Sequence, residues 1–229
     1  MSVRSLAELG TTMKRVVTSH QETPHEEVVN SLTHALGFGL SAAGLWSFLH
    51  WFGNRPIAAW STGLFGATLT LLYLCSAAYH ACPRSALKPR LQRLDHVAIF
   101  LFIAGSYTPF CLLALPNPLA DYVLATVWTL ATVGGLFSLC GGTRFPTLSM
   151  ALMLALGWMA VFIFPYLLHS LSWSALGYLV GGGLSYTLGS VFFATHFFRF
   201  SHAVWHLFVM TGSLCHFACV WITAQSCPF

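Results

Sequence analysis

Charged residues are scarce in this chain. Of its 229 residues only 7% are Asp, Glu, Lys or Arg, whereas 56% are hydrophobic and the mean hydropathy is +0.71. A soluble domain carries about 25% charged residues, so this sequence has too few charges to cover a surface that faces water. The shortage argues against a soluble globular protein and predicts a single integral membrane domain, for which lipid is the solvent.

Two other features are missing. The polar N-terminal stretch contains no apolar run, so it does not have the pattern of a secretory signal peptide. The seven cysteines form no C-x-x-C pair, and most of them fall in or beside apolar runs, where a free cysteine behaves as a small hydrophobe. The cysteines therefore indicate neither a thiolate metal site nor a disulfide framework. Within the polar stretch, residues 6–17 have a weak pattern of a short interfacial helix.

Seven apolar stretches are each long enough to cross the hydrocarbon core as a helix, which takes about 20 residues. They are residues 31–52, 57–80, 96–115, 119–140, 147–168, 174–195 and 202–223. The breaks between them are short, so consecutive helices must run antiparallel, and the continuous apolar runs disfavour a β-barrel. The sequence predicts an all-α integral membrane protein, with a seven-transmembrane helix bundle over residues 27–225. A polar cytoplasmic segment, 1–26, and a short external tail, 226–229, flank it. Pro109 and Pro165 predict kinks in the third and fifth spans.

Lys and Arg predict the orientation of the bundle. With the N-terminus in the cytoplasm, nine of the ten fall in cytoplasmic segments and only Arg55 falls outside. Because cytoplasmic loops are enriched in Lys and Arg, we expect a cytoplasmic N-terminus and an external C-terminus. The net charge of +4 is then explained by topology and by anionic headgroups, and no nucleic-acid partner is expected. Nothing in the sequence specifies an oligomeric state.

Polar residues gather at one depth of this topology, near the cytoplasmic face. His80 ends the second span, Asp95 opens the third, and His202 and His206 open the seventh. His202 and His206 are four residues apart, as are Ser76 and His80, so each pair shares one face of a helix. The start of the first span adds Glu27, Asn30 and His34 at helical spacing.

This set of residues is typical of a metal site. Three neutral imidazoles can hold Zn²⁺ and leave its fourth tetrahedral position to water, whose pKa the ion lowers to about 7. Asp95 could take the proton of that water, and Ser76 could orient it or polarise a carbonyl oxygen. Ligating histidines usually donate their other N–H to an acceptor, and Glu27, Asn30 and His34 are the candidates for that support.

Other interpretations remain open at this point. A transmembrane histidine often serves only to hydrogen-bond a neighbouring helix, and two histidines could instead hold haem. The H-x-x-x-H pair also lacks the glutamate of H-E-x-x-H, because Trp205 precedes His206. His96 is expected at the membrane interface. His216 lies ten residues beyond His206 and is expected to be packed and hydrogen-bonded.

The segments 27–34, 76–80, 94–96 and 201–206 resemble the hemolysin III proteins, the bacterial branch of the progestin and adiponectin receptor (PAQR) family. The resemblance covers residues 26 to about 224, and its combined motif of S-x-x-x-H, Asp and H-x-x-x-H on seven spans is specific. It implies a multi-pass protein of a bacterial cell (inner) membrane. It also implies zinc held by His80, His202 and His206, with Asp95 contacting the ion through water and Ser76 in the same motif. The long N-terminal domain of the receptor branch is absent here, so hormone binding is not implied.

Three functions from different classes follow. The first is a zinc-dependent hydrolase that cleaves an amide or ester of a membrane lipid, as the ceramidase-like activity attributed to some relatives implies. The second is a sensor or regulator of membrane lipid homeostasis in which zinc is structural. The third is a cytolysin, which the family name implies but which an apolar multi-span chain fits least. In the first two, a membrane lipid is the expected substrate or ligand.

Overall fold

The predicted bundle of seven membrane-spanning helices is confirmed. The computed structural model describes residues 22–195 and 197–227, so the stretch predicted for residues 6–17 lies outside the described part. The helices are α2 (Pro24–Phe52), α3 (Pro56–Ala81), α4 (Lys88–Ala114), α5 (Leu119–Leu139), the short 3-10 helix η1 (Gly142–Arg144), α6 (Pro146–Trp158), α7 (Ala160–Ser170), α8 (Trp173–Thr195) and α9 (Ser201–Ser226). Helices α6 and α7 together form one span, and all seven spans are long and apolar enough to cross a membrane.

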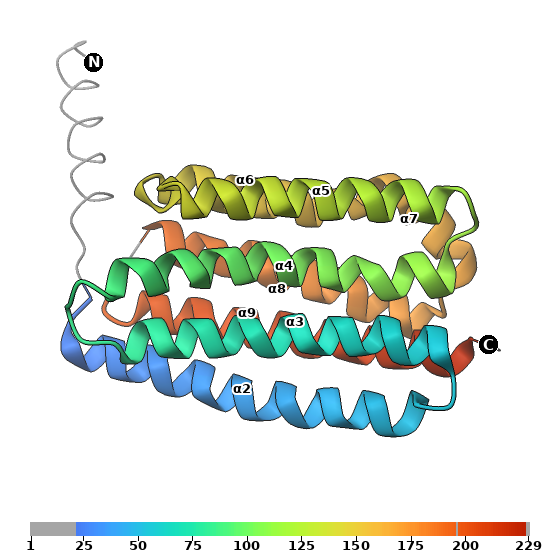
Figure 1. Cartoon of the computed structure of the whole chain (residues 1–229), viewed down its shortest axis with the longest axis horizontal. Helices are drawn as coiled ribbons and strands as arrows, with labels where there is room; N and C mark the ends of the chain where they lie inside the picture. The colour runs from blue at the N-terminus through green and yellow to red at the C-terminus, as the bar shows by residue number, and fades with distance from the viewer. Residues whose placement is uncertain (1–21, 196, 228–229) are drawn as a thin grey trace, which may run out of the picture.

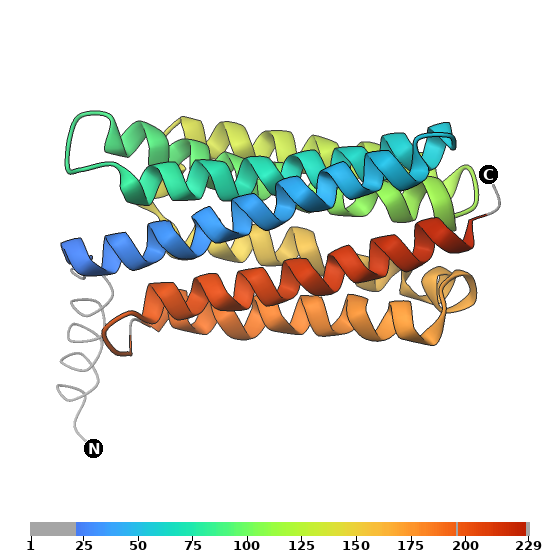
Figure 2. The ribbon, with the colours of Figure 1, turned by 90° about the horizontal axis from the view of Figure 1, so that it is seen from below.

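The seven spans lie side by side with their axes roughly parallel (Figure 1). Helix α2 packs against α3 and α9, α3 packs against α4, and α8 packs against α9. Figure 2 shows α2 and α9, the first and last spans, as neighbours on one face of the bundle. The described chain begins and ends at opposite ends of the bundle, as an odd number of spans requires.

The first helix begins earlier than the hydropathy predicts. It starts at Pro24, inside the segment predicted to be polar and cytoplasmic, because its N-terminus is capped. The Thr23 hydroxyl accepts a hydrogen bond from the Glu26 N–H at 3.4 Å, and Glu26 Oε2 accepts one from the Thr23 N–H at 2.8 Å. This reciprocal capping box satisfies amide donors that a helix start otherwise leaves unpaired. Two extra turns of helix therefore carry Glu27 and Asn30 into the bundle.

Glu26 also connects the start of α2 to the start of α9, two segments that are far apart in the sequence. Its side chain is 1% exposed, and Oε1 accepts a hydrogen bond at 3.0 Å from the N–H of Phe200, just before α9. Phe200 has a φ of +68°, a left-handed conformation that is uncommon for a bulky residue. A buried carboxylate needs such partners, and the contact places the start of α9 against the start of α2.

The two spans that contain Pro109 and Pro165 differ in continuity. Helix α4 runs through Pro109 without interruption. The fifth span is broken at Met159, six residues before Pro165, into α6 and α7. The Tyr107 hydroxyl of α4 lies 2.9 and 2.7 Å from the carbonyl oxygens of Leu156 and Gly157, to which it donates. A side chain from the neighbouring span thus satisfies backbone acceptors beside the break, which makes the break tolerable inside a membrane.

Candidate metal centre

Three histidines from two helices meet at the end of the bundle where α2 and α9 begin. His80 is in the last turn of α3, and His202 and His206 are in the first two turns of α9. One nitrogen from each ring lies within 4.8 Å of the others, and the ring centroids are 4.7 to 5.0 Å apart. This cluster could hold a metal ion.

The ring of His80 is fixed from behind by Glu27 of α2. His80 Nδ1 lies 2.8 Å from Glu27 Oε2, and the other carboxylate oxygen pairs with Lys88 Nζ at 2.7 Å. Lys88 also donates to the carbonyl oxygens of Tyr79 and Cys82, at 3.2 and 3.1 Å. Glu27 thus bridges a histidine of α3 to the first residue of α4, so the loop between these helices is tied to the site.

The rings of His206 and His202 have oxygen atoms behind them as well. His206 Nδ1 lies 3.0 Å from Thr33 Oγ1 and 3.2 Å from the Asn30 carbonyl oxygen. Thr33 Oγ1 donates its own proton to backbone carbonyls of α2, so it can accept from the imidazole. His202 Nδ1 lies 3.6 Å from Glu22 Oε1, an electrostatic contact that is too long for a hydrogen bond.

This arrangement fits a metal ion. With Nδ1 of His80 and His206 hydrogen-bonded to an oxygen, the Nδ1–H tautomer of these two rings is favoured and Nε2 keeps its lone pair, as in metal-ligating histidines. Nε2 of His80 is buried and has no hydrogen-bond partner in the described part of the chain. In a tetrahedral zinc site the ligand nitrogens are roughly 3.3 Å apart, given Zn–N distances of about 2.0–2.1 Å. The three rings therefore have to draw closer together around an ion.

Asp95 and Ser76 lie beside the histidines, on the wall of a cavity. Ser76 is buried one turn before His80, and Asp95 of α4 is partly buried. The two side chains interact with each other, and Asp95 also interacts electrostatically with His80 and His96. Ser76, Asp95, His202 and His206 all line the same cavity. The residues that sequence reasoning assigned to catalysis are thus together with two of the three predicted ligands.

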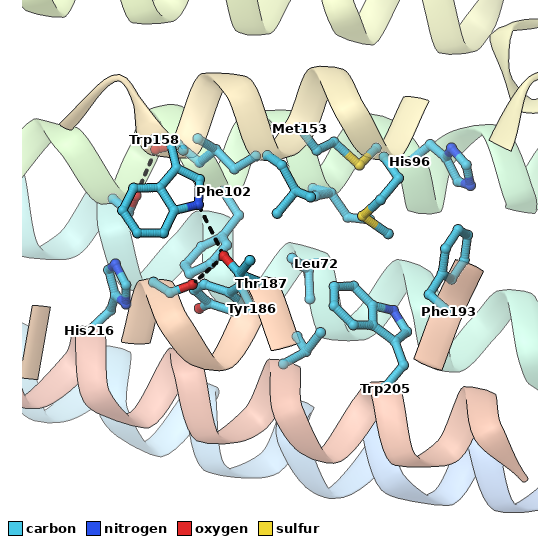
Figure 3. Close-up of a pocket in the computed structure, with 18 of the residues that line it drawn as sticks. Leu72, His96, Phe102, Met153, Trp158, Tyr186, Thr187, Phe193, Trp205 and His216 are labelled. Atoms are coloured by element: carbon cyan, nitrogen blue, oxygen red, sulfur yellow. Dashed lines mark hydrogen bonds between the residues drawn. The ribbon is translucent and has the colours of Figure 1, made fainter. Parts of the chain in front are cut away.

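The cavity extends from the histidines into the bundle. Its volume is about 260 Å³, close to the lower end of the range for ligand pockets, roughly 300–1,000 Å³. Figure 3 shows it between α4 and α6 on one side and α8 and α9 on the other. Phe193, Trp205 and His96 lie toward one end, and Trp158 and His216 lie at the other. Between them the wall is mainly apolar, with Leu72, Phe102 and Met153 among the side chains that form it.

Asn30 and His34 take positions that the sequence did not specify. Asn30 reaches His206 through its backbone carbonyl, and its side-chain amide has no hydrogen-bond partner within the described residues. His34 stacks on His206, with ring centroids 3.5 Å apart and planes 14° apart. Of the three predicted supporting residues, only Glu27 contacts a histidine of the cluster through a side-chain hydrogen bond.

Sequence reasoning missed four residues that organise the site: Glu22, Glu26, Thr33 and Lys88. Glu22 and Glu26 lie in the stretch assigned to the polar cytoplasmic segment 1–26, and Lys88 lies in a break between spans that was counted only for its charge. The T-x-x-E pattern of Thr23 and Glu26 is a helix-start signal that could have placed the first span earlier. His96, expected at the membrane interface, is 8% exposed and lines the cavity, a contact that the sequence did not predict.

Together these features define a class of protein: a helical membrane protein of seven spans with a histidine cluster, able to hold a metal ion, at one end of an internal cavity. Its six described Lys and Arg residues other than Arg55 lie on the segments that join helices at that end or in the first turns of α4. This agrees with the cytoplasmic side predicted for the site.

The family follows from sequence comparison. The model of the haemolysin-III-related family matches residues 22–217. The chain is 37% identical over 210 residues to the hemolysin-3 homolog of Bacillus subtilis (strain 168), covering 90% of this chain and 98% of that protein. It is 35% identical to hemolysin-3 of Bacillus cereus, covering 85% and 90%. Similarity extends to human monocyte to macrophage differentiation factor, at 28% identity over 88% and 86% of the two chains.

The chain belongs to the haemolysin-III-related family, and the similarity to the human protein is consistent with the wider PAQR family. Seven apolar spans and bacterial relatives identify it as a multi-pass protein of the bacterial cell membrane, the inner one where there are two.

Proposed function

We propose that this protein is a zinc-dependent hydrolase that cleaves an acyl amide or ester of a membrane lipid at the inner leaflet. The observation that carries the proposal is the cavity, whose largely apolar interior opens onto His202, His206, Asp95 and Ser76 at one end. An acyl chain fits such an interior, and its carbonyl group would then lie next to the polar end. Apolar pockets with a few convergent polar groups are the usual form of small-molecule sites.

Zinc is the metal that suits this donor set. Three neutral imidazoles are borderline-soft nitrogen ligands, and a three-histidine set leaves one position open, as in catalytic zinc sites. When bound, the ion supplies a Lewis acid that polarises a carbonyl and makes water a nucleophile near neutral pH. The described ligand group consists of three histidines and includes no cysteine, which argues against metals that select sulfur ligands.

The residues of the chain supply the proton transfers and the positioning. Water adds to the lipid carbonyl, the bond from that carbon to the amide nitrogen or ester oxygen breaks, and a fatty acid and an amine or alcohol are released. Asp95 takes the proton of the attacking water and returns it to the leaving nitrogen or oxygen. Ser76, in contact with Asp95, orients the carboxylate or the carbonyl by a hydrogen bond. The apolar cavity holds the chain and keeps the carbonyl in place.

The test is lipid turnover by the purified protein in liposomes. We expect a panel of N-acyl and O-acyl lipids to include at least one that releases fatty acid, detected by mass spectrometry. Release should stop when the metal is removed by a chelator and should return when zinc, but not magnesium, is added. Folded protein that carries zinc and releases fatty acid from none of these lipids would contradict the proposal.

One observation favours a second candidate, a membrane sensor with structural zinc. The histidines come from α3 and α9, and their supporting groups come from α2 and the residues before it, so an ion there would join three spans. In that case removing zinc would lower the melting temperature in detergent, and no lipid would be turned over. An unchanged melting curve after complete zinc removal would argue against this candidate.

Glu27 allows a prediction about zinc affinity. Glu27→Gln should weaken zinc binding by about 10- to 100-fold, the usual cost of losing the partner that orients a ligating histidine. The measurement is competition with a chromogenic chelator. Asp121→Asn is the matched control, because Asp121 is exposed at the start of α5, at the opposite end of the bundle. Equal affinity in Glu27→Gln and wild type would remove Glu27 from the site.

A further inference from the structure

His216 lies at the end of the cavity that is remote from the histidine cluster. It follows His206 by ten residues on α9, which corresponds to about 15 Å along a helix axis. It lines the same cavity, and Figure 3 shows it at the edge beside Trp158 and Tyr186. An ionisable side chain at this depth in a membrane is costly and is a functional candidate by default.

The ring of His216 is held firmly in one orientation. Its Nδ1–H donates to the Gly212 carbonyl oxygen at 3.0 Å, one turn earlier on the same helix. On the other side the ring lies against Gly182 of α8, where even a methyl group would collide with Nδ1. The Tyr186 ring lies 5.4 Å away, between centroids. The expectation of a packed, hydrogen-bonded histidine therefore holds for one of its two nitrogens.

The second nitrogen, Nε2, is left as a hydrogen-bond acceptor. With the proton on Nδ1 the neutral imidazole can only accept at Nε2, and no described residue donates to that atom. Nε2 is not among the fully enclosed polar atoms without partners, so it keeps some accessible surface, and His216 is one of the residues that line the cavity. An acceptor kept unpaired in an apolar space costs about 1–3 kcal/mol, so a ligand that donates there would gain from the pairing.

The hydroxyl groups of Tyr186 and Thr187, which lie near His216, already form hydrogen bonds within the protein. Thr187 Oγ1 donates to the Gly183 carbonyl and accepts from Trp158 Nε1 at 3.0 Å. The Tyr186 hydroxyl pairs with Ser213 Oγ at 3.1 Å. A lone water molecule at this place would need two to four polar partners to be stable, and these side chains have few bonds left to offer. A hydroxyl group carried on a hydrocarbon chain needs only the one bond, because the chain itself is held by apolar contacts.

We propose that His216 is a specificity-determining residue, whose Nε2 accepts a hydrogen bond from a hydroxyl group on the acyl chain of the ligand. The hydroxyl lies about 15 Å from the carbonyl, the separation of His206 and His216 along α9. The site thus selects lipids with a hydroxylated acyl chain over unsubstituted chains of the same length. This inference rests on the proposed function only in that an acyl chain occupies the cavity with its carbonyl at the histidine cluster.

Equilibrium binding tests it without any need for turnover. The probes are octadecanoic acid and a series of hydroxyoctadecanoic acids with the hydroxyl at successive positions, titrated into zinc-loaded protein in detergent by calorimetry. We expect one mid-chain position to bind about tenfold more tightly than the unsubstituted acid, which corresponds to one hydrogen bond of about 1.4 kcal/mol. In His216→Phe that preference should vanish while the unsubstituted acid and zinc still bind.

Two further variants sharpen the result. His216→Gln keeps a hydrogen-bond acceptor and should retain part of the preference. His169→Phe changes an exposed histidine in the last turn of α7 and should behave as wild type. Equal affinity across the series in wild type, or a preference that survives His216→Phe, would overturn the inference and leave the hydrolase proposal standing. Selective binding without any lipid turnover would instead support the inference and contradict the hydrolase. Absence of binding by every acid would overturn the inference and the acyl-chain occupancy together.

Discussion

Replacing any one of His80, His202 and His206 with alanine is expected to reduce bound zinc from about one ion per chain to nearly none. A site with one open position has three protein ligands, and losing one of them leaves two. Among the described residues, the candidate ligand group contains these three histidines and no fourth member that could replace a lost ligand. The measurement is metal content by mass spectrometry on detergent-purified protein.

The controls separate loss of metal from loss of fold. His50→Ala and His169→Ala remove exposed histidines outside the cluster and should leave zinc content unchanged. Helical content and elution volume should match wild type in all five variants. If well-folded wild-type protein purified with zinc present contains none, the histidines serve helix packing and the metal site does not exist.

Asp95→Asn is expected to abolish most lipid hydrolysis while leaving zinc in place. Asparagine has the size of aspartate and can still hydrogen-bond Ser76, but it cannot take a proton from water. Loss of a general base lowers rates by about 10²- to 10⁴-fold, so kcat should fall within that range. Fatty acid release at saturating lipid, measured beside zinc content, checks both parts of the prediction.

The rate of lipid hydrolysis by Ser76→Ala and by Asp121→Asn shows whether the loss of activity is particular to Asp95. A serine that only orients other groups contributes a single hydrogen bond, so Ser76→Ala should cost about tenfold. The distant Asp121→Asn should have no effect. Full activity of Asp95→Asn with normal zinc would show that another group handles the proton, and it would remove Asp95 from the catalytic step.

The depth of each residue in the membrane could be predicted from the sequence. Each span crosses the bilayer roughly along its normal, so the position of a residue within its span determines its depth. Apolar run lengths and the short breaks placed His80, Asp95, His202 and His206 near one membrane face, and the structure brings these residues to one end of the bundle. Rotation about each helix axis is a different matter. It depends on packing against neighbours, so the burial of His96 could not be predicted from its position near a span end.

The supporting residues could not be predicted because their partners are remote in sequence. Glu26 was assigned to the polar cytoplasmic segment, yet its carboxylate accepts a hydrogen bond from the N–H of Phe200, 174 residues away. The break at Met159 is a similar case. Pro165 predicted an irregularity in this span. The sequence did not predict that the Tyr107 hydroxyl of α4 would donate to the carbonyl oxygens of Leu156 and Gly157, just before the break. The local sequence shows that a buried polar group needs a hydrogen-bond partner. Which residue supplies that partner depends on the fold.

The support that α2 and the residues before it give to the histidines has a consequence for biogenesis. The first span carries no histidine of the cluster, yet Glu27 and the Asn30 carbonyl orient His80 and His206, and Glu22 lies behind His202. Two of these histidines are in α9, the last described span, which is synthesised after the other six. The cluster can therefore assemble only after α2 and α9 have met in the bilayer, and an ion bound there would be captured at that late stage of membrane insertion.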